Sequence, residues 1–121
     1  ALAHLCCYAD FDTMIKTGAH QGHGVYLAIP GLLDLAGNGE IAGLGAPRPQ
    51  FIGLGAKDPL TPPEAIERAL VDTKAAYRAA DAEQNLEVLI EPDSGHEETP
   101  AIRAAVLAFF ARHLCDAGRA S

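Results

Sequence analysis

The second half of the chain alternates between strand-like and helix-like segments, and this alternation restricts the possible folds more than any other feature. Short apolar runs at residues 50–55 and 86–91 are typical of buried strands, and helical patterns headed by proline follow them from Thr61 and Thr99. The opening run from Ala1 to Tyr8 is a third segment of buried-strand type. Because a helix between two strands implies a parallel crossover, the sequence predicts an α/β fold with about three parallel strands and flanking helices.

The two long helices carry clear start signals and apolar faces. Thr61 is expected to be an N-cap, with proline at the first helical position and Glu64 closing a capping box. The apolar positions expected to face the sheet are Ile66, Ala69, Leu70, Thr73, Tyr77 and Ala80 in the first helix, and Ile102, Val106, Phe109, Phe110 and His113 in the second. We expect the second helix to end by Gly118, and the partly alternating strand before Pro92 to lie near a sheet edge.

Residues 14–45 are rich in glycine and contain the sequence Ile29-Pro30-Gly31. Such residues interrupt regular structure, so only short helices are predicted there, around 12–16 and 32–35. The rest of this segment is expected to be loop.

Composition bounds the class of protein. Of the residues, 49% are hydrophobic and 21% are charged, and the net charge is −7, which favours a globular piece spanning residues 1–121 and argues against nucleic-acid binding. Three cysteines do not make a disulfide framework, and neither a signal peptide nor a membrane-spanning run is visible. We expect a cytoplasmic protein with no membrane partner.

Two polar side chains stand directly after predicted strands. Asp58 follows the strand at 50–55, and His96 follows the strand at 86–91. In open parallel sheets, binding and catalytic groups gather at this carboxyl edge. A carboxylate that orients an imidazole, whose other nitrogen accepts a proton from a nucleophile, is the acid–base part of a catalytic triad, and Asp58 and His96 can fill these two roles.

Several motifs around these residues resemble the dienelactone-hydrolase and acetyl-esterase branch of the α/β-hydrolases. The motifs are Ala46-Pro-Arg-Pro before a strand, Asp58-Pro-Leu-Thr-Pro-Pro after it, Gly95-His96-Glu with Thr99-Pro100, and Ile29-Pro-Gly-Leu-Leu within residues 26–33. The resemblance covers nearly the whole chain, and the acid precedes the histidine as in that superfamily. It implies that residues 1–121 are the C-terminal part of an α/β-hydrolase fold, with the sixth, seventh and eighth strands of its sheet.

The resemblance implies a carboxylic-ester hydrolase with a Ser-His-Asp triad, a small ester as substrate and no cofactor. Asp58 would be the acid and His96 the base, while Tyr26, Leu27 and Ile29 would contribute apolar substrate contacts. No Gly-x-Ser-x-Gly nucleophile elbow occurs in the chain. The nucleophile is therefore expected from an N-terminal half of the same fold, without which this chain is expected to be nearly inactive.

Other interpretations stay open at this point. Asp10 or Asp12, after the first predicted strand, are alternative acids, and the adjacent cysteines Cys6 and Cys7 are unconvincing nucleophiles because no glycines flank them. His20 and His23 lack a third ligand, so no metal is predicted. The competing functional hypothesis is a non-catalytic module that associates with a second copy through the exposed edge of its first strand.

Overall fold

The computed structural model describes residues 1–24 and 28–115. Its sheet has three parallel strands in the order β1-β2-β3, formed by Leu2–Leu5, Gln50–Gly55 and Leu86–Glu91. The α-helices are α1 (Phe11–Thr17), α2 (Asn38–Gly43), α3 (Pro63–Ala79) and α4 (Pro100–Phe110). Short 3-10 turns are η1 (Ala19–Gly22), η3 (Leu32–Asp34) and η4 (Glu83–Asn85), and α4 continues into a π-helical turn, η5 (Ala111–Cys115). The predicted fold class, parallel strands with flanking helices, is confirmed.

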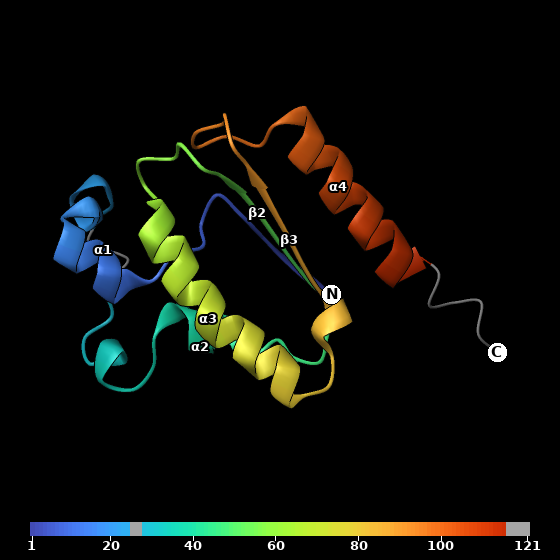
Figure 1. Ribbon diagram of the computed structural model, residues 1–121, viewed down its shortest axis with the longest axis horizontal. Helices are drawn as coiled ribbons and strands as arrows, with labels where there is room; N and C mark the ends of the chain where they lie inside the picture. Colours follow the sequence, from blue (N-terminus) through green and yellow to red (C-terminus); the bar gives the residue numbers. More distant parts are fainter. Residues whose placement is uncertain (25–27, 116–121) are drawn as a thin grey trace.

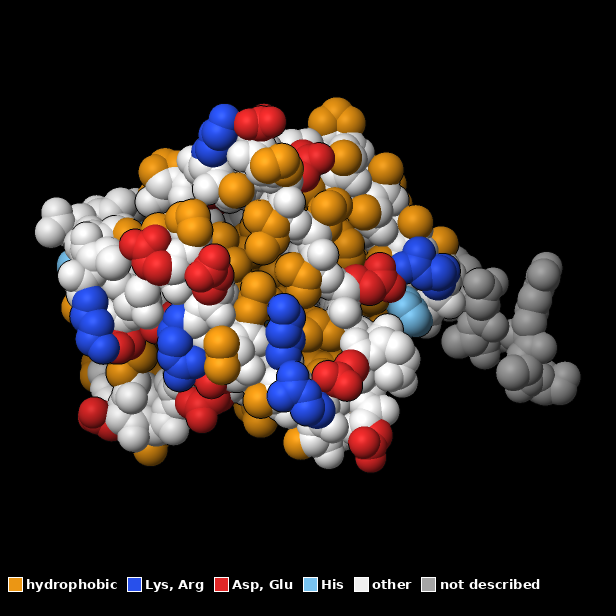
Figure 2. All heavy atoms as spheres, in the orientation of Figure 1, with side chains coloured by type: hydrophobic (Ala, Val, Ile, Leu, Met, Phe, Trp, Pro, Cys, Tyr) orange, Lys and Arg blue, Asp and Glu red, His pale blue; other side chains and the backbone are white. Residues whose placement is uncertain are grey.

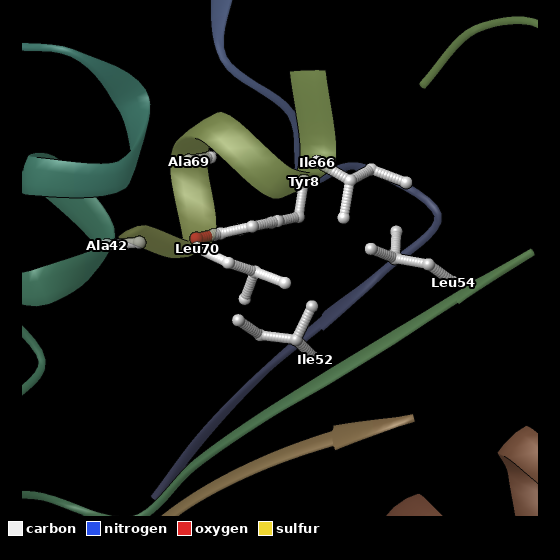
Figure 3. Packing of buried hydrophobic residues seen from close by; sticks show 7 residues of the cluster. All are labelled: Tyr8, Ala42, Ile52, Leu54, Ile66, Ala69 and Leu70. Atoms are coloured by element: carbon white, nitrogen blue, oxygen red, sulfur yellow. The ribbon is translucent and has the colours of Figure 1, made fainter. Parts of the chain in front are cut away.

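Helices cover both faces of the sheet, with α3 on one side and α4 on the other (Figure 1). The central strand β2 is buried along its whole length because it is paired on both edges. Its side chains alternate between the two faces, so that Ile52 and Leu54 pack toward α3 while Phe51 packs against Phe109 of α4. Figure 3 shows the first of these clusters, with Ile66 and further α3 side chains above β2.

The helix α2 was not predicted, because its glycines read as loop residues. Both glycines instead allow a close approach to α3. A Cβ on Gly39 would lie 2.2 Å from the carbonyl oxygen of Ala69, and one on Gly43 would lie 2.8 Å from the Cβ of Ala76. The short helices predicted around 12–16 and 32–35 are present as α1 and η3.

Two predicted boundaries differ from the structure, and a third is not described. The first strand is shorter than Ala1 to Tyr8, because Cys6 has a left-handed φ of 55° that turns the chain out of the sheet after Leu5. The N-cap of α3 is Pro62 rather than Thr61, because the Thr61 hydroxyl is bonded elsewhere. The predicted end near Gly118 lies outside the described residues.

The surface of the described chain is mixed. In the orientation of Figure 1, Figure 2 shows hydrophobic side chains gathered in the middle of the visible face, with acidic and basic side chains around them. Exposed apolar side chains include Val71, Ile90 and Leu107. Among the described helices, none is long and apolar enough to cross a bilayer.

Candidate active site

Asp58 lies in the turn that joins the end of β2 to α3, and it is 2% exposed. Three donors hold its carboxylate. The Leu60 N–H donates to Oδ1 at 2.8 Å, and the Thr61 hydroxyl donates to Oδ2 at 2.9 Å. The third donor is the ring of His96, whose Nδ1 lies 2.8 Å from Oδ2. A buried carboxylate needs such donors, because desolvation without them is costly.

His96 reaches Asp58 from the loop after β3, across 38 residues of sequence. A carboxylate oxygen accepts, so the imidazole carries its proton on Nδ1. Among the described residues, no hydrogen bond engages Nε2, and the His96 side chain is 48% exposed. The arrangement leaves a proton-accepting nitrogen that points away from its carboxylate partner, which is the geometry of an acid–base pair.

The two loops meet because the last residue of β2 has no side chain. A Cβ on Gly55 would lie 2.3 Å from the carbonyl oxygen of Gly95 and 2.4 Å from that of Ser94. Two backbone hydrogen bonds hold the Asp58 turn against the loop after β3. The Ala56 N–H donates to the Glu91 oxygen at 2.8 Å, and the Lys57 N–H donates to the Ser94 oxygen at 2.9 Å. Residues 92–99 join β3 to α4 and carry His96, and in this histidine loop Gly95 directly precedes His96. A Cβ on Gly95 would meet nothing closer than 4.0 Å, so Gly55 is the glycine that the site requires.

The alternative acids are placed in other roles. Asp10 is the N-cap of α1, where its Oδ2 accepts from the N–H and the hydroxyl of Thr13. Asp12 forms an exposed ion pair with Lys16. Neither carboxylate is hydrogen-bonded to His96, whereas Asp58 is.

Among the described residues, no nucleophilic side chain is hydrogen-bonded to His96, although Cys6 and Cys7 line a hollow that the His96 ring also lines. Burial, followed by the nearby Asp58 charge, raises the pKa of the Cys6 thiol, and burial also raises that of Cys7, so both favour the unreactive thiol form. Ser94 is buried, and its Oγ has no hydrogen-bond partner among the residues described.

Of the three predicted apolar substrate contacts, only Ile29 is described, and it does not lie at this site. Tyr26 and Leu27 lie outside the described residues. Ile29 is 61% exposed and lines a separate hollow with Ile15 and Leu33. A substrate contact of these three residues stays a prediction.

The histidines of η1 and its C-cap bind backbone rather than each other. The His20 Nδ1 lies 3.3 Å from the Met14 carbonyl oxygen, and the His23 Nε2 lies 2.7 Å from that of Leu60. Within residues 1–24 and 28–115, no three His, Cys, Asp or Glu side chains group as a metal site would need.

Sequence reasoning missed Thr61, Leu60 and His23 as parts of this site. Leu60 and Thr61 are two and three residues from Asp58, so an Asp-x-x-Thr turn was a usable signal for them. His23 is hydrogen-bonded to the Leu60 carbonyl oxygen across 37 residues of sequence, and no local sequence pattern predicts such a contact.

Comparison with known proteins gives two likenesses. No protein-family model matches the chain. The protein named "Putative hydrolase YtaP" from Bacillus subtilis (strain 168) is 34% identical over 110 residues, which are 91% of this chain and 36% of that protein. The solved structure of "Methylesterase BT1017" matches with a TM-score of 0.55 and 30% identity, over 65% of this chain and 17% of that chain. The chain thus spans about a third of the curated relative it matches, and both likenesses support a hydrolase-type α/β fold.

Proposed function

We propose that this chain supplies the acid and the base of a serine-type carboxylic-ester hydrolase of the dienelactone-hydrolase and acetyl-esterase branch. The observation that carries the proposal is the hydrogen bond from His96 Nδ1 to the buried Asp58 carboxylate, with Nε2 left uncommitted. Two proteins similar to the chain are named as a hydrolase and a methylesterase, which supports ester chemistry.

In this proposal, Nε2 of His96 takes the proton of a serine hydroxyl as the serine attacks the ester carbonyl, and later returns it to the leaving alcohol. Asp58 holds the tautomer and stabilises the imidazolium that forms. The serine and the oxyanion donors come from an upstream part of the same polypeptide, since the described residues offer neither beside His96.

The free edge of β1 supports that partner. In the described chain, β1 pairs with β2 alone and its residues are half-buried. A hollow of about 540 Å³ runs beside it, lined by Leu2, His4, Ile41 and Leu44. His96 is not among the residues that line this hollow, so we assign it to packing of the upstream part and not to substrate.

The test is ester turnover by a polypeptide that carries this chain with its upstream region. His96→Ala is expected to lower kcat by about 10⁶, and Asp58→Asn by about 10⁴, because the asparagine favours the wrong imidazole tautomer. The matched control is Asp93→Asn. Asp93 lies in the histidine loop, and its exposed carboxylate is paired with Lys57. Equal activity of the Asp58 and Asp93 variants would refute the assignment of Asp58.

A second candidate function rests on the same free edge of β1. If a second copy of the chain covers that edge, the protein is a self-associating module without catalysis. Analytical ultracentrifugation of the 121-residue chain separates the two candidates. A stable dimer, together with ester turnover unaffected by His96→Ala, would favour the module.

A further inference from the structure

A second hollow, of about 320 Å³, opens directly beside His96. Most of its lining is apolar, with Leu5, Phe11, Met14 and Leu60 among the lining residues, while Cys6, Cys7, Asn38, Thr61, His23 and His96 add polar groups. At about 30 Å³ for each water-sized group, the volume corresponds to roughly ten non-hydrogen atoms. The hollow is therefore small, with dimensions that fit one short apolar group.

One wall of the hollow is built by α1 and by His23, the residue that follows η1. Met14 of α1 is buried, and Asp10 caps the start of that helix. η1 packs closely on the Asp58 turn, since a Cβ on Gly22 would lie 2.7 Å from the Cδ2 of Leu60. His23, which follows η1, donates from Nε2 to the Leu60 carbonyl oxygen at 2.7 Å.

Leu60 connects this wall to the catalytic carboxylate. Its carbonyl oxygen accepts from His23, while its own N–H donates to Asp58 Oδ1 at 2.8 Å. A displacement of Leu60 would therefore move a donor of Asp58, and through Asp58 the ring of His96. His23 thus lies at the start of a continuous path of hydrogen bonds that ends at the proposed base.

We propose that this hollow binds the apolar acyl or alkyl group of the ester, and that His23 is a positioning residue that fixes the hollow's wall to the Asp58 turn. The inference rests on the proposed ester hydrolase. Its ligand class follows from the mostly apolar lining, the small volume and the presence of the His96 ring in the wall of the hollow.

The binding part is tested by NMR titration of the 121-residue chain with methyl esters of increasing length, from methyl acetate to methyl decanoate. The Met14 methyl and the His96 ring signals are expected to shift, and affinity is expected to rise until the ester reaches roughly ten non-hydrogen atoms, then to level off. Absence of shifts at Met14, or affinity that rises with every added carbon, overturns the assignment. If the isolated chain gives no dispersed spectrum, the polypeptide extended upstream is titrated in the same way.

The positioning part is tested by the exchange with water of the His96 Nδ1 proton. His23→Ala is expected to accelerate this exchange about fivefold to tenfold, the effect of losing one ordinary hydrogen bond from the path. His23→Gln is expected to restore slow exchange, because its amide can donate to the Leu60 carbonyl oxygen. The matched control is His20→Ala, because the His20 ring is hydrogen-bonded to the Met14 carbonyl oxygen and not to Leu60.

The same variants separate a positioning role from a merely structural one. A structural role would change the exchange of backbone amides in α4 as well, and His23→Gln would not restore the His96 signal. Unchanged exchange in His23→Ala, or equal effects of the His20 and His23 variants, overturns the positioning role. Neither measurement needs turnover, so a failure of the proposed hydrolase activity stays distinguishable from a failure of this inference.

Discussion

Replacing Gly55 by alanine is the sharpest perturbation of the site that leaves its polar groups in place. The new Cβ would lie 2.3 Å from the Gly95 oxygen and 2.4 Å from the Ser94 oxygen. Since a carbon–oxygen contact is normally about 3.3 Å or more, the histidine loop must retreat by roughly 1 Å. The φ of Gly55 is not in the left-handed region, so alanine meets no backbone strain there.

The sign of the expected effect is opposite to the usual one. Alanine in a strand is ordinarily more stable than glycine by about 0.5–1 kcal/mol. Here overpacking against backbone costs about 1–3 kcal/mol, and separation of His96 from Asp58 removes a charge-assisted bond of about 1.5–3 kcal/mol. Because the His96 side chain is 48% exposed, the lower part of that range applies, and the net loss of unfolding free energy is about 2–4 kcal/mol.

Urea unfolding measures this loss, and NMR reports whether the Nδ1 proton of His96 is still protected. The matched control is Gly95→Ala, directly before His96, where the nearest atom to a new Cβ is 4.0 Å away. We expect that control to be within about 0.5 kcal/mol of the parent chain. If Gly55→Ala is as stable as Gly95→Ala and keeps the protected His96 proton, the close approach of the histidine loop does not depend on the missing side chain at Gly55.

Three further predictions concern buried polar groups. Thr61→Val is expected to lower the unfolding free energy by about 1–3 kcal/mol in urea titrations, because Asp58 loses a donor, whereas exposed Thr17→Val is expected to change little. Burial lowers the pKa of His4 below 6.5 in the folded state. The contribution of His4 to the free energy of unfolding is therefore complete above pH 6.5 and is lost as the pH falls toward the folded-state pKa, and His4→Gln is expected to remove this part of the pH dependence. Burial raises the pKa of Tyr8 to about 12 from 10, so its contribution is complete below pH 10 and is lost as the pH rises toward 12; ultraviolet titration is expected to show a late-ionising component, part of which Tyr8→Phe removes. Unfolding curves that do not change with pH in these two windows would contradict the last two predictions.

The sequence predicted the pairing of Asp58 and His96 because topology alone brings them together. Each follows a strand of the same parallel sheet, and adjacent parallel strands end at the same edge. The helix faces were predictable for a similar reason, since five of the six positions expected to pack from α3 are buried: Ile66, Ala69, Leu70, Thr73 and Tyr77.

The errors arose where one residue type suits two roles. Thr61 before Pro62 has the pattern of an N-cap, but its hydroxyl donates to the Asp58 carboxylate instead. Gly39 and Gly43 have the pattern of a loop, but they permit α2 to approach α3. Local sequence does not contain the partner that decides between these roles, because the partner lies in another element.

The three donors of the Asp58 carboxylate differ widely in their separation from Asp58 along the sequence. Leu60 and Thr61 hold Asp58 from two and three residues away, whereas His96 arrives from 38 residues away. Two of the three donors that orient Asp58 therefore belong to its own turn and do not involve β3 or the loop after it. If the histidine loop opened, the hydrogen bond between His96 and Asp58 would be lost, but Leu60 and Thr61 would still orient the Asp58 carboxylate. The imidazole could then return to an acceptor that is already in position.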